Sequence, residues 1–216
     1  MLLRSLFKFL TITFVIALAG CASFPQQEVA QAGAMPDVSQ YQHKPSVYVD
    51  FRFFRGKPGS NAAPLEMPQA KAQLHPMIER VLSDSHLFSS YTFDEFQKDK
   101  TDYTIKIYAY NHGEAGLAAI GGFITGFTFG VIPSAVTDQY TVTVEAVNKD
   151  GSAVKDLSNH DEVTTWLGLW LIPAMGNTPI KAINSTLENQ VRSALKELVE
   201  SGSLKYSWLT HSLNEG

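Results

Sequence analysis

The sequence predicts an α+β fold: a mixed or antiparallel sheet of about five strands, with two helices on one face and an apolar, Gly-rich excursion between two strands. Several short segments alternate apolar and polar residues with the period of two that a half-buried strand shows. Two longer segments repeat apolar residues with the period of an amphipathic helix. Because the sheet and each helix must bury an apolar face, both helices are expected on one side of the sheet.

The first half of the chain is expected to form a strand, a helix and a second, short strand. Segment 46–54 alternates apolar residues at Val47, Val49, Phe51 and Phe53, which predicts a strand. Segment 66–87 predicts a helix, with Pro68 near its first turn and Pro76 as a point of kinking. Its apolar stripe consists of Leu74, Met77, Ile78, Val81 and Leu82. Segment 87–93 suits a short strand.

The second half is expected to form a strand, a β-hairpin and a helix. Segments 103–110 and 139–148 both alternate as strands do. Lys149-Asp150-Gly151 predicts a hairpin turn, since glycine tolerates a positive φ, and 153–166 is the returning strand. Segment 178–201 predicts a helix, capped by Thr178 and followed by Gly202. Its apolar stripe consists of Ile180, Ile183, Leu187, Val191, Ala194, Leu195 and Leu198.

The N-terminus has the three parts of a secretory signal. Residues 1–8 carry two positive charges, residues 9–18 form an uncharged run, and small residues precede Cys21. The apolar run is shorter than the roughly 20 residues of a membrane-spanning helix. At its end, Leu18-Ala19-Gly20-Cys21 resembles the lipobox of bacterial membrane lipoprotein precursors.

The resemblance implies that cleavage precedes Cys21, which then carries diacylglycerol on its sulfur and a fatty acyl chain such as palmitate on its amino group. Several acyl chains hold a protein on a membrane far more firmly than one chain does. Ala22 at the next position implies sorting to the outer membrane of a cell envelope, with the domain facing the periplasm. Since Cys21 is the single cysteine, its acylation leaves no thiol for a disulfide, a thiolate metal site or a nucleophile. An ordinary signal peptide with an incidental cysteine is the alternative.

These features divide the chain into four parts. A lipoprotein signal peptide (1–20) is followed by a lipidated N-terminus and flexible tether (21–45), because 22–45 is rich in Ala, Gln and Pro and lacks an apolar period. As a flexible coil, this tether would span roughly 25 to 30 Å. A single α+β domain (46–205) and a C-terminal tail (206–216) complete the chain.

Two uncharged segments concentrate much of the apolar content. Segment 115–136 is long enough to span a bilayer as a helix, but its glycines, its proline and its β-branched and aromatic residues favour an extended conformation. Segment 166–175 is too short to span as a helix. If 103–110 pairs antiparallel with 139–148, both segments leave the same end of the sheet, opposite the hairpin turn.

Three interpretations of this apolar end are open. The two segments could pack on each other and on the sheet as an extension of the core, or 115–136 could span a membrane. A third interpretation is an exposed interface for lipid, for self-association or for an envelope protein partner, because exposed apolar patches mark interaction sites. The interface residues would then be Phe123, Phe127, Phe129, Trp166 and Trp170.

Composition and motifs argue against several functional classes. The chain has a formal net charge of −4 and no basic block, which is unfavourable for binding nucleic acid. The six histidines include no pair at helical spacing, so no metal site or cofactor is expected. His112 and His160 lie near carboxylates in the sequence and could meet in space. No nucleophile-elbow, phosphate-loop or dinucleotide-binding motif occurs.

The expected function is therefore non-catalytic: an envelope lipoprotein anchored by acylated Cys21, with an assembly, scaffolding or transport-accessory role. One alternative is an oligomeric secretion or pore-type component that inserts segments 115–136 and 166–175 into the membrane. Another alternative is an envelope hydrolase whose site is assembled from residues distant in the sequence.

Overall fold

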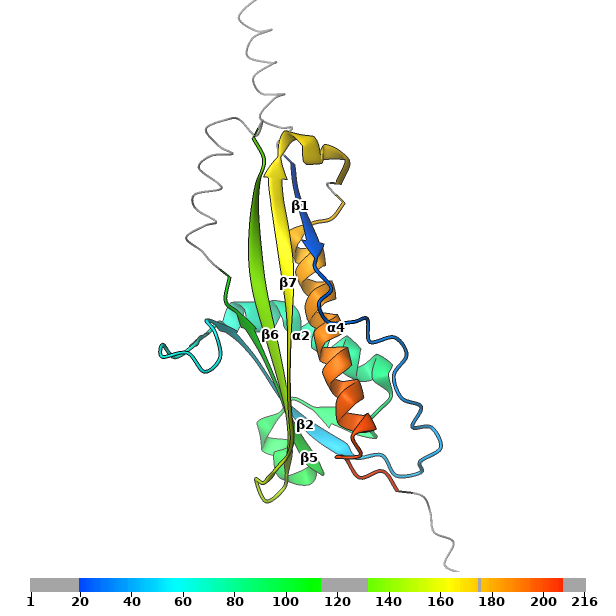
Figure 1. Ribbon diagram of the computed structural model, residues 1–216. Coiled ribbons are helices and arrows are strands. Elements are labelled where there is room, and N and C mark those ends of the chain that lie inside the picture. The colour runs from blue at the N-terminus through cyan, green and yellow to red at the C-terminus, as the bar shows by residue number, and fades with distance from the viewer. Residues whose placement is uncertain (1–19, 114–131, 175, 208–216) are drawn as a thin grey trace, which may run out of the picture. The chain divides into compact units, whose positions relative to one another are not determined.

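The computed structural model describes residues 20–113, 132–174 and 176–207 (Figure 1), and every structural statement below concerns these residues. Phe123, Phe127 and Phe129 lie outside them. The strands are β1 (Gly20–Pro25), β2 (Ser46–Arg55), β3 (Leu65–Glu66), β4 (Ser90–Thr92), β5 (Tyr103–Asn111), β6 (Ser134–Asn148) and β7 (Ala153–Gly168). The helices are α2 (Pro68–Ser85), η1 (Glu95–Lys100), η2 (Leu169–Ala174) and α4 (Pro179–Glu200).

The fold is α+β, as predicted, and its sheet is mixed. The strand order is β1-β7-β6-β5-β2-β3, and β4 also pairs with β2. Strands β4 and β5 run parallel to β2, whereas β5–β6, β1–β7 and β2–β3 are antiparallel. The sheet has seven strands rather than about five because β1 and the two-residue β3 carry no alternating pattern.

The hairpin turn and the later helix form where the sequence predicts them. Gly151 has a φ of 83° and donates its backbone N–H to Asn148 O at 3.0 Å, which closes the turn between β6 and β7. Helix α4 begins beside Thr178, whose Oγ1 accepts from Lys181 N at 3.3 Å. Gly202, at a φ of 69°, follows its end.

Contacts divide the chain into two compact units. Unit 1 comprises Met1–Gln26, His112–Gln139 and Glu162–Thr186, and unit 2 comprises Gln27–Asn111, Tyr140–Asp161 and Leu187–Gly216. Strands β6 and β7 and helix α4 contribute residues to both units. The prediction of one domain over 46–205 did not anticipate this division.

The core of unit 2 lies between one face of its strands and two helices. Apolar residues alternate into this core from β2, β5 and β6, and the pairing register brings Phe51, Ile107 and Val144 side by side. Helix α2 packs on β2 through the stripe predicted from the sequence, and Pro76 lies inside it. Arg80 on α2 reaches Glu188 on α4 at 3.1 Å, so the two helices are neighbours.

The segment predicted to be a flexible tether lies on the folded chain instead. In unit 1, Gly20–Pro25 pairs with β7 as strand β1. In unit 2, Asn189 of α4 binds the backbone of the N-terminal segment: its Oδ1 accepts from Ala32 N at 2.9 Å, and its Nδ2 donates to Val29 O at 3.1 Å. The polar composition of this segment reflects bonding through its backbone, which needs no apolar period.

Two further side chains of α4 strengthen this docking. Arg192 donates to Gly33 O and Lys196 donates to Ala32 O, both at 3.0 Å.

None of the helices in the described part of the chain is long and apolar enough to cross a membrane.

Candidate membrane-facing surface

Strand β1 places Cys21 at the end of β7. The antiparallel register sets Cys21 opposite Leu167 and Ala22 opposite Trp166. Residues that face each other in this way have Cα atoms about 4.5 to 5.5 Å apart. The residue that resembles a lipidation site is therefore also a paired residue of the sheet.

Polar cross-strand contacts hold this register. Ser23 Oγ lies 2.7 Å from Thr165 Oγ1, and Gln26 Nε2 donates to Thr164 Oγ1 at 2.8 Å. On the other side of β7, Thr137 Oγ1 lies 2.9 Å from Thr164 Oγ1. Thr–Thr and Ser–Thr pairs stabilise sheets by about 0.2 to 1 kcal/mol each. The three strands of unit 1 are thus joined by side chains as well as by their backbones.

Exposed apolar side chains gather in the same unit. The most exposed large hydrophobic residues of the described chain are Phe24, Leu65, Phe96, Ile132, Trp166, Trp170 and Ile180. All of them except Leu65 and Phe96 belong to unit 1. We call the set Phe24, Ile132, Trp166, Trp170 and Ile180 the unit-1 apolar surface.

Strand pairing and chain order relate three of these residues to one another within unit 1. Phe24 lies diagonally across from Trp166 on one face of the β1–β7 pair, and Ala22, opposite Trp166, is fully buried. Trp170 belongs to η2, which follows β7 directly and contacts β1.

The two remaining members lie close to the same strands. Ile132 precedes β6 by two residues. Ile180 follows Asn177, whose carbonyl accepts from Ser23 N at 2.8 Å.

The structure confirms part of the expected convergence of the two apolar segments. Strand β6 begins where β7 ends, because the two strands form a hairpin whose turn lies at their other ends. The flank of segment 115–136 and the start of segment 166–175 therefore meet at one end of unit 1. The body of the first segment lies outside the described residues.

The exposed fractions of the side chains in unit 1 can be compared with the expectations from the sequence. Trp166 and Trp170 are 41% and 74% exposed. Ile180 was expected on the buried stripe of the last helix, but it is 73% exposed, so that prediction is wrong. Helical spacing gives the side of the helix on which a residue lies and does not show whether another element covers its turn. Phe24 was not predicted, and its position three residues after Cys21 was its one signal.

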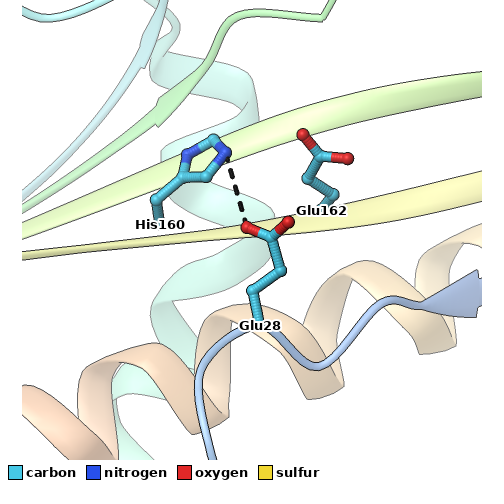
Figure 2. A group of neighbouring side chains, drawn as sticks. All are labelled: Glu28, His160 and Glu162. Atoms are coloured by element: carbon cyan, nitrogen blue, oxygen red, sulfur yellow. Dashed lines mark ion pairs between the residues drawn. The ribbon is translucent and has the colours of Figure 1, made fainter.

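The histidines considered for catalysis lie in different units. In unit 2, His160 Nε2 lies 3.9 Å from Glu28 Oε2, the ion pair drawn in Figure 2. Asp161 is buried, and its Oδ1 accepts from Glu28 N at 3.2 Å. In unit 1, His112 donates its backbone N–H to Gln139 O at 2.9 Å. The Glu28 contacts hold the N-terminal segment against β7.

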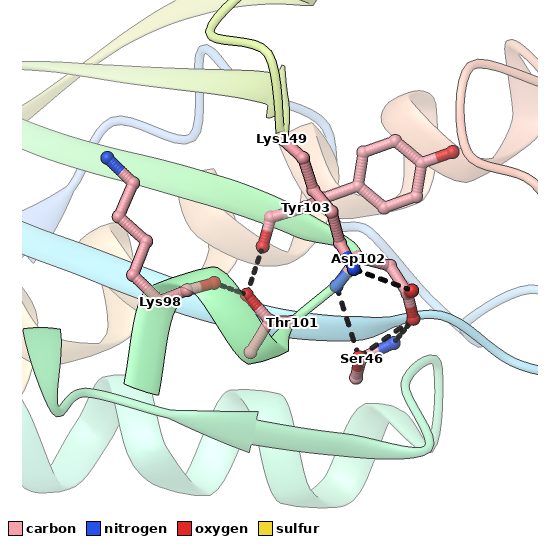
Figure 3. Close-up of polar contacts among 6 residues, drawn as sticks. All are labelled: Ser46, Lys98, Thr101, Asp102, Tyr103 and Lys149. Atoms are coloured by element: carbon pink, nitrogen blue, oxygen red, sulfur yellow. Dashed lines mark hydrogen bonds and ion pairs between the residues drawn. The ribbon is translucent and has the colours of Figure 1, made fainter. Parts of the chain in front are cut away.

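Unit 2 also contains an open, polar cleft of about 710 Å³ beside the hairpin turn. Within it, Asp102 Oδ2 accepts from Ser46 N at 2.8 Å and from Ser46 Oγ at 2.7 Å, and Lys149 lies 3.9 Å from the same carboxylate (Figure 3). These bonds from the backbone and then the side chain of Ser46 lower the pKa of Asp102. Lys44 donates to His86 O at 2.8 Å. The charged groups of the cleft thus join loops to the start of β2.

A polar and aromatic network lies on the sheet face opposite the helices of unit 2. Tyr108 donates to Asp50 Oδ2 at 2.9 Å, and Arg52 Nε donates to Asp50 Oδ1 at 3.0 Å. Burial, followed by the bond to Asp50, raises the pKa of Tyr108 above its ordinary value. The rings of Phe54 and Tyr110 stack with centroids 5.0 Å apart. The network fixes side chains across β2 and β5, whose pairing is parallel.

Comparisons with known proteins give limited similarity. No family model matches the sequence, and no curated protein matches it. Among solved structures, the chain is similar to the PelC dodecamer from Paraburkholderia phytofirmans, with a TM-score of 0.37 and 10% identity over 82% of this chain and 97% of that chain. A leucine-to-methionine variant of that dodecamer, from the same organism, gives a TM-score of 0.37 and 11% identity over 76% and 94% of the two chains. Similarity this low does not establish a common fold.

Proposed function

We propose that this chain is a non-catalytic lipoprotein of a bacterial cell envelope, anchored by acylated Cys21, with an assembly, scaffolding or transport-accessory role. The observation that carries the proposal is the coincidence of two features in unit 1. The lipobox cysteine lies there, and so does the unit-1 apolar surface. Exposed apolar residues concentrated in one part of a protein mark a site of association.

The polar clusters of unit 2 support an accessory role better than catalysis. Asp102 and Asp50 each accept hydrogen bonds that fix neighbouring strands and loops. Glu28 bonds through its backbone N–H to Asp161. These polar groups therefore stabilise the fold by connecting neighbouring strands, loops and the N-terminal segment.

The anchor is tested with the full chain and Cys21→Ser. Expressed in a Gram-negative host, the unaltered chain is expected to incorporate labelled palmitate and to fractionate with the outer membrane. Cys21→Ser should lose the label and leave the membrane in a wash that keeps integral proteins. Serine nearly matches the size of cysteine in β1, so the thermal unfolding midpoint should change little. A Cys21→Ser protein that stays on the membrane as firmly as the unaltered chain would refute the anchor.

A second candidate is an oligomeric secretion or pore-type component. The observation that favours it is the exposure of both tryptophans of segment 166–175, beside the flank of segment 115–136. Light scattering of the lipidated protein in detergent is expected to give a defined multiple of the chain mass. A monomer at every protein concentration would exclude the oligomeric component and would not affect the proposal of an anchored accessory lipoprotein.

A further inference from the structure

We infer that unit 1 is held directly against a lipid surface, with Trp166 and Trp170 at the headgroup level, because the anchored residue is itself paired in the sheet. The inference rests on the proposed acylation of Cys21. It goes beyond the proposed function by naming lipid as the partner of the unit-1 apolar surface. It also replaces the flexible tether expected over residues 21–45 with direct contact.

The register leaves no spacer between the anchor and the apolar surface. Cys21 lies opposite Leu167, and the next pair along β1 is Ala22 with Trp166. A flexible tether over 21–45 would let the domain stand roughly 25 to 30 Å from its anchor. With β1 paired, the backbone of the acylated residue lies one residue pair from Trp166, at the end of the strand pair, while the two side chains point to opposite faces.

Several bonds keep β1 in this position. Ser23 N donates to Asn177 O at 2.8 Å on one side, and Ser23 Oγ contacts Thr165 on the other. Gln26 N donates to Glu162 O at 2.8 Å, which continues the pairing past the end of β1. For β1 as a whole to leave unit 1, these bonds would have to break.

The composition around the anchor suits lipid. Segments 163–180 and 115–137 contain no Asp, Glu, Lys or Arg, and neither does the chain from Cys21 to Gln27. Tryptophan is enriched where membranes meet water, because its ring is apolar and its indole N–H is polar. The acyl chains of Cys21 would make lipid an obligatory neighbour of this surface. A second copy of the chain has no such fixed connection to it, so lipid is the occupant that these observations favour.

Tryptophan fluorescence in vesicles tests the inference. Trp208 is the remaining tryptophan, so Trp208→Phe combined with Trp166→Phe or Trp170→Phe leaves a single reporter at 170 or 166. The acylated full chain is placed in phosphatidylethanolamine–phosphatidylglycerol vesicles, with or without bromine on the acyl chains. Both reporters should show blue-shifted emission and lose intensity in the brominated vesicles.

An exposed aromatic residue of unit 2 supplies the matched control. Phe96 is 96% exposed in η1. Phe96→Trp, with the three native tryptophans replaced by Phe, should emit as a water-exposed tryptophan and should not be quenched. Equal quenching at position 96 would indicate non-specific adsorption and would overturn the inference.

A spacer variant separates this inference from the anchor itself. Eight Gly/Ser residues inserted between Cys21 and Ala22 leave the lipobox and the rest of β1 in place and add an r.m.s. span of about 16 Å. Mass spectrometry should still detect the acyl chains, while quenching of Trp166 and Trp170 should fall.

The remaining outcomes are also decisive. Absence of acyl chains on the unaltered protein would refute the proposed function itself. Acylated protein whose two reporters are not quenched would refute only the contact with lipid. Reporters that are blue-shifted yet unquenched, in protein that scatters light as an oligomer, would assign the surface to a second copy and overturn the inference.

Discussion

Asn189 binds the backbone of Ala32 across the surface of α4, with its Oδ1 2.9 Å from Ala32 N. The same amide donates to Val29 O and Ala30 O at 3.1 and 3.3 Å, and the Asn189 side chain is buried. One side chain thus satisfies three backbone groups of the N-terminal segment. The segment is held by its backbone, so its own side chains show little sign of the docking.

Asn189→Ala is expected to lower the free energy of unfolding by about 1 to 3 kcal/mol, because a buried N–H loses its acceptor. Urea denaturation measures this change, and limited proteolysis should cut faster within residues 27–36. Ser193→Ala is the matched control, since Ser193 is half-buried and its bond to Ala30 O is longer, at 3.5 Å. Equal effects of the two substitutions would mean that Asn189 does not hold the segment.

Tyr108→Phe is expected to make the protein less sensitive to alkali. Burial and the bond to Asp50 raise the pKa of Tyr108 in the folded state above 10.0. As the pH rises past that ordinary value, the unfolded chain loses the tyrosine proton first, so stability falls. Without the phenol, the free energy of unfolding should decline less steeply from neutral pH to above 10. An unchanged pH dependence of the free energy of unfolding would contradict the raised pKa of Tyr108.

The neutral-pH effect of the same substitution is separate. Loss of one hydrogen bond to Asp50 should cost about 1 kcal/mol, measured by urea denaturation at pH 7. Asp50→Asn keeps the Tyr108 phenol and removes the negative charge beside it. The free energy of unfolding should therefore also decline less steeply at alkaline pH in this variant.

Asp102→Asn is expected to reduce the sensitivity of the protein to acid. Bonds from Ser46 lower the pKa of Asp102 in the folded state below 3.8. As the pH falls past that value, the unfolded chain binds the proton first, and the contribution of Asp102 to stability is lost. The unaltered protein should therefore be more stable at neutral pH and approach the variant in acid. The difference should be at most about 1 kcal/mol, because the carboxylate is half exposed.

Ser46→Ala provides the complementary measurement for Asp102. It removes the hydroxyl donor at 2.7 Å and keeps the backbone donor at 2.8 Å. Part of the acid dependence should therefore remain. A Ser46→Ala variant with the full acid dependence would show that the hydroxyl bond does not contribute.

Thr186→Val is expected to leave stability unchanged or to raise it by up to about 1 kcal/mol. Thr186 is 2% exposed, and its Oγ1 has no hydrogen-bond partner within the part of the chain that the structure describes. Valine keeps the shape and removes the buried hydroxyl, whereas Thr186→Ala also removes a methyl group and should destabilise. Thermal and urea unfolding measure both variants. A destabilised valine variant would reveal a partner for the hydroxyl.

Local patterns predicted the central elements of this fold correctly. Alternating residues in β2, β5 and β6 and the glycine of the hairpin turn each act within a few residues, so they are readable from the sequence. The antiparallel pairing of β5 with β6 meets the condition on which the expected convergence of the two apolar segments depended. The parallel pairing of β2 with β5 did not follow, because periodicity gives the buried face of a strand and leaves its neighbour and direction open.

The sequence by itself determined the α+β class, the amphipathic helices and the motif that resembles a lipobox. Only the tertiary structure decided that β1 pairs with β7, since Ser23 and Thr165 lie 142 residues apart and their contact leaves no local period. It also decided that Ile180 is exposed, because burial depends on what covers a helical turn. Local patterns record what neighbouring residues favour, whereas contacts between distant segments exist only once the chain has folded.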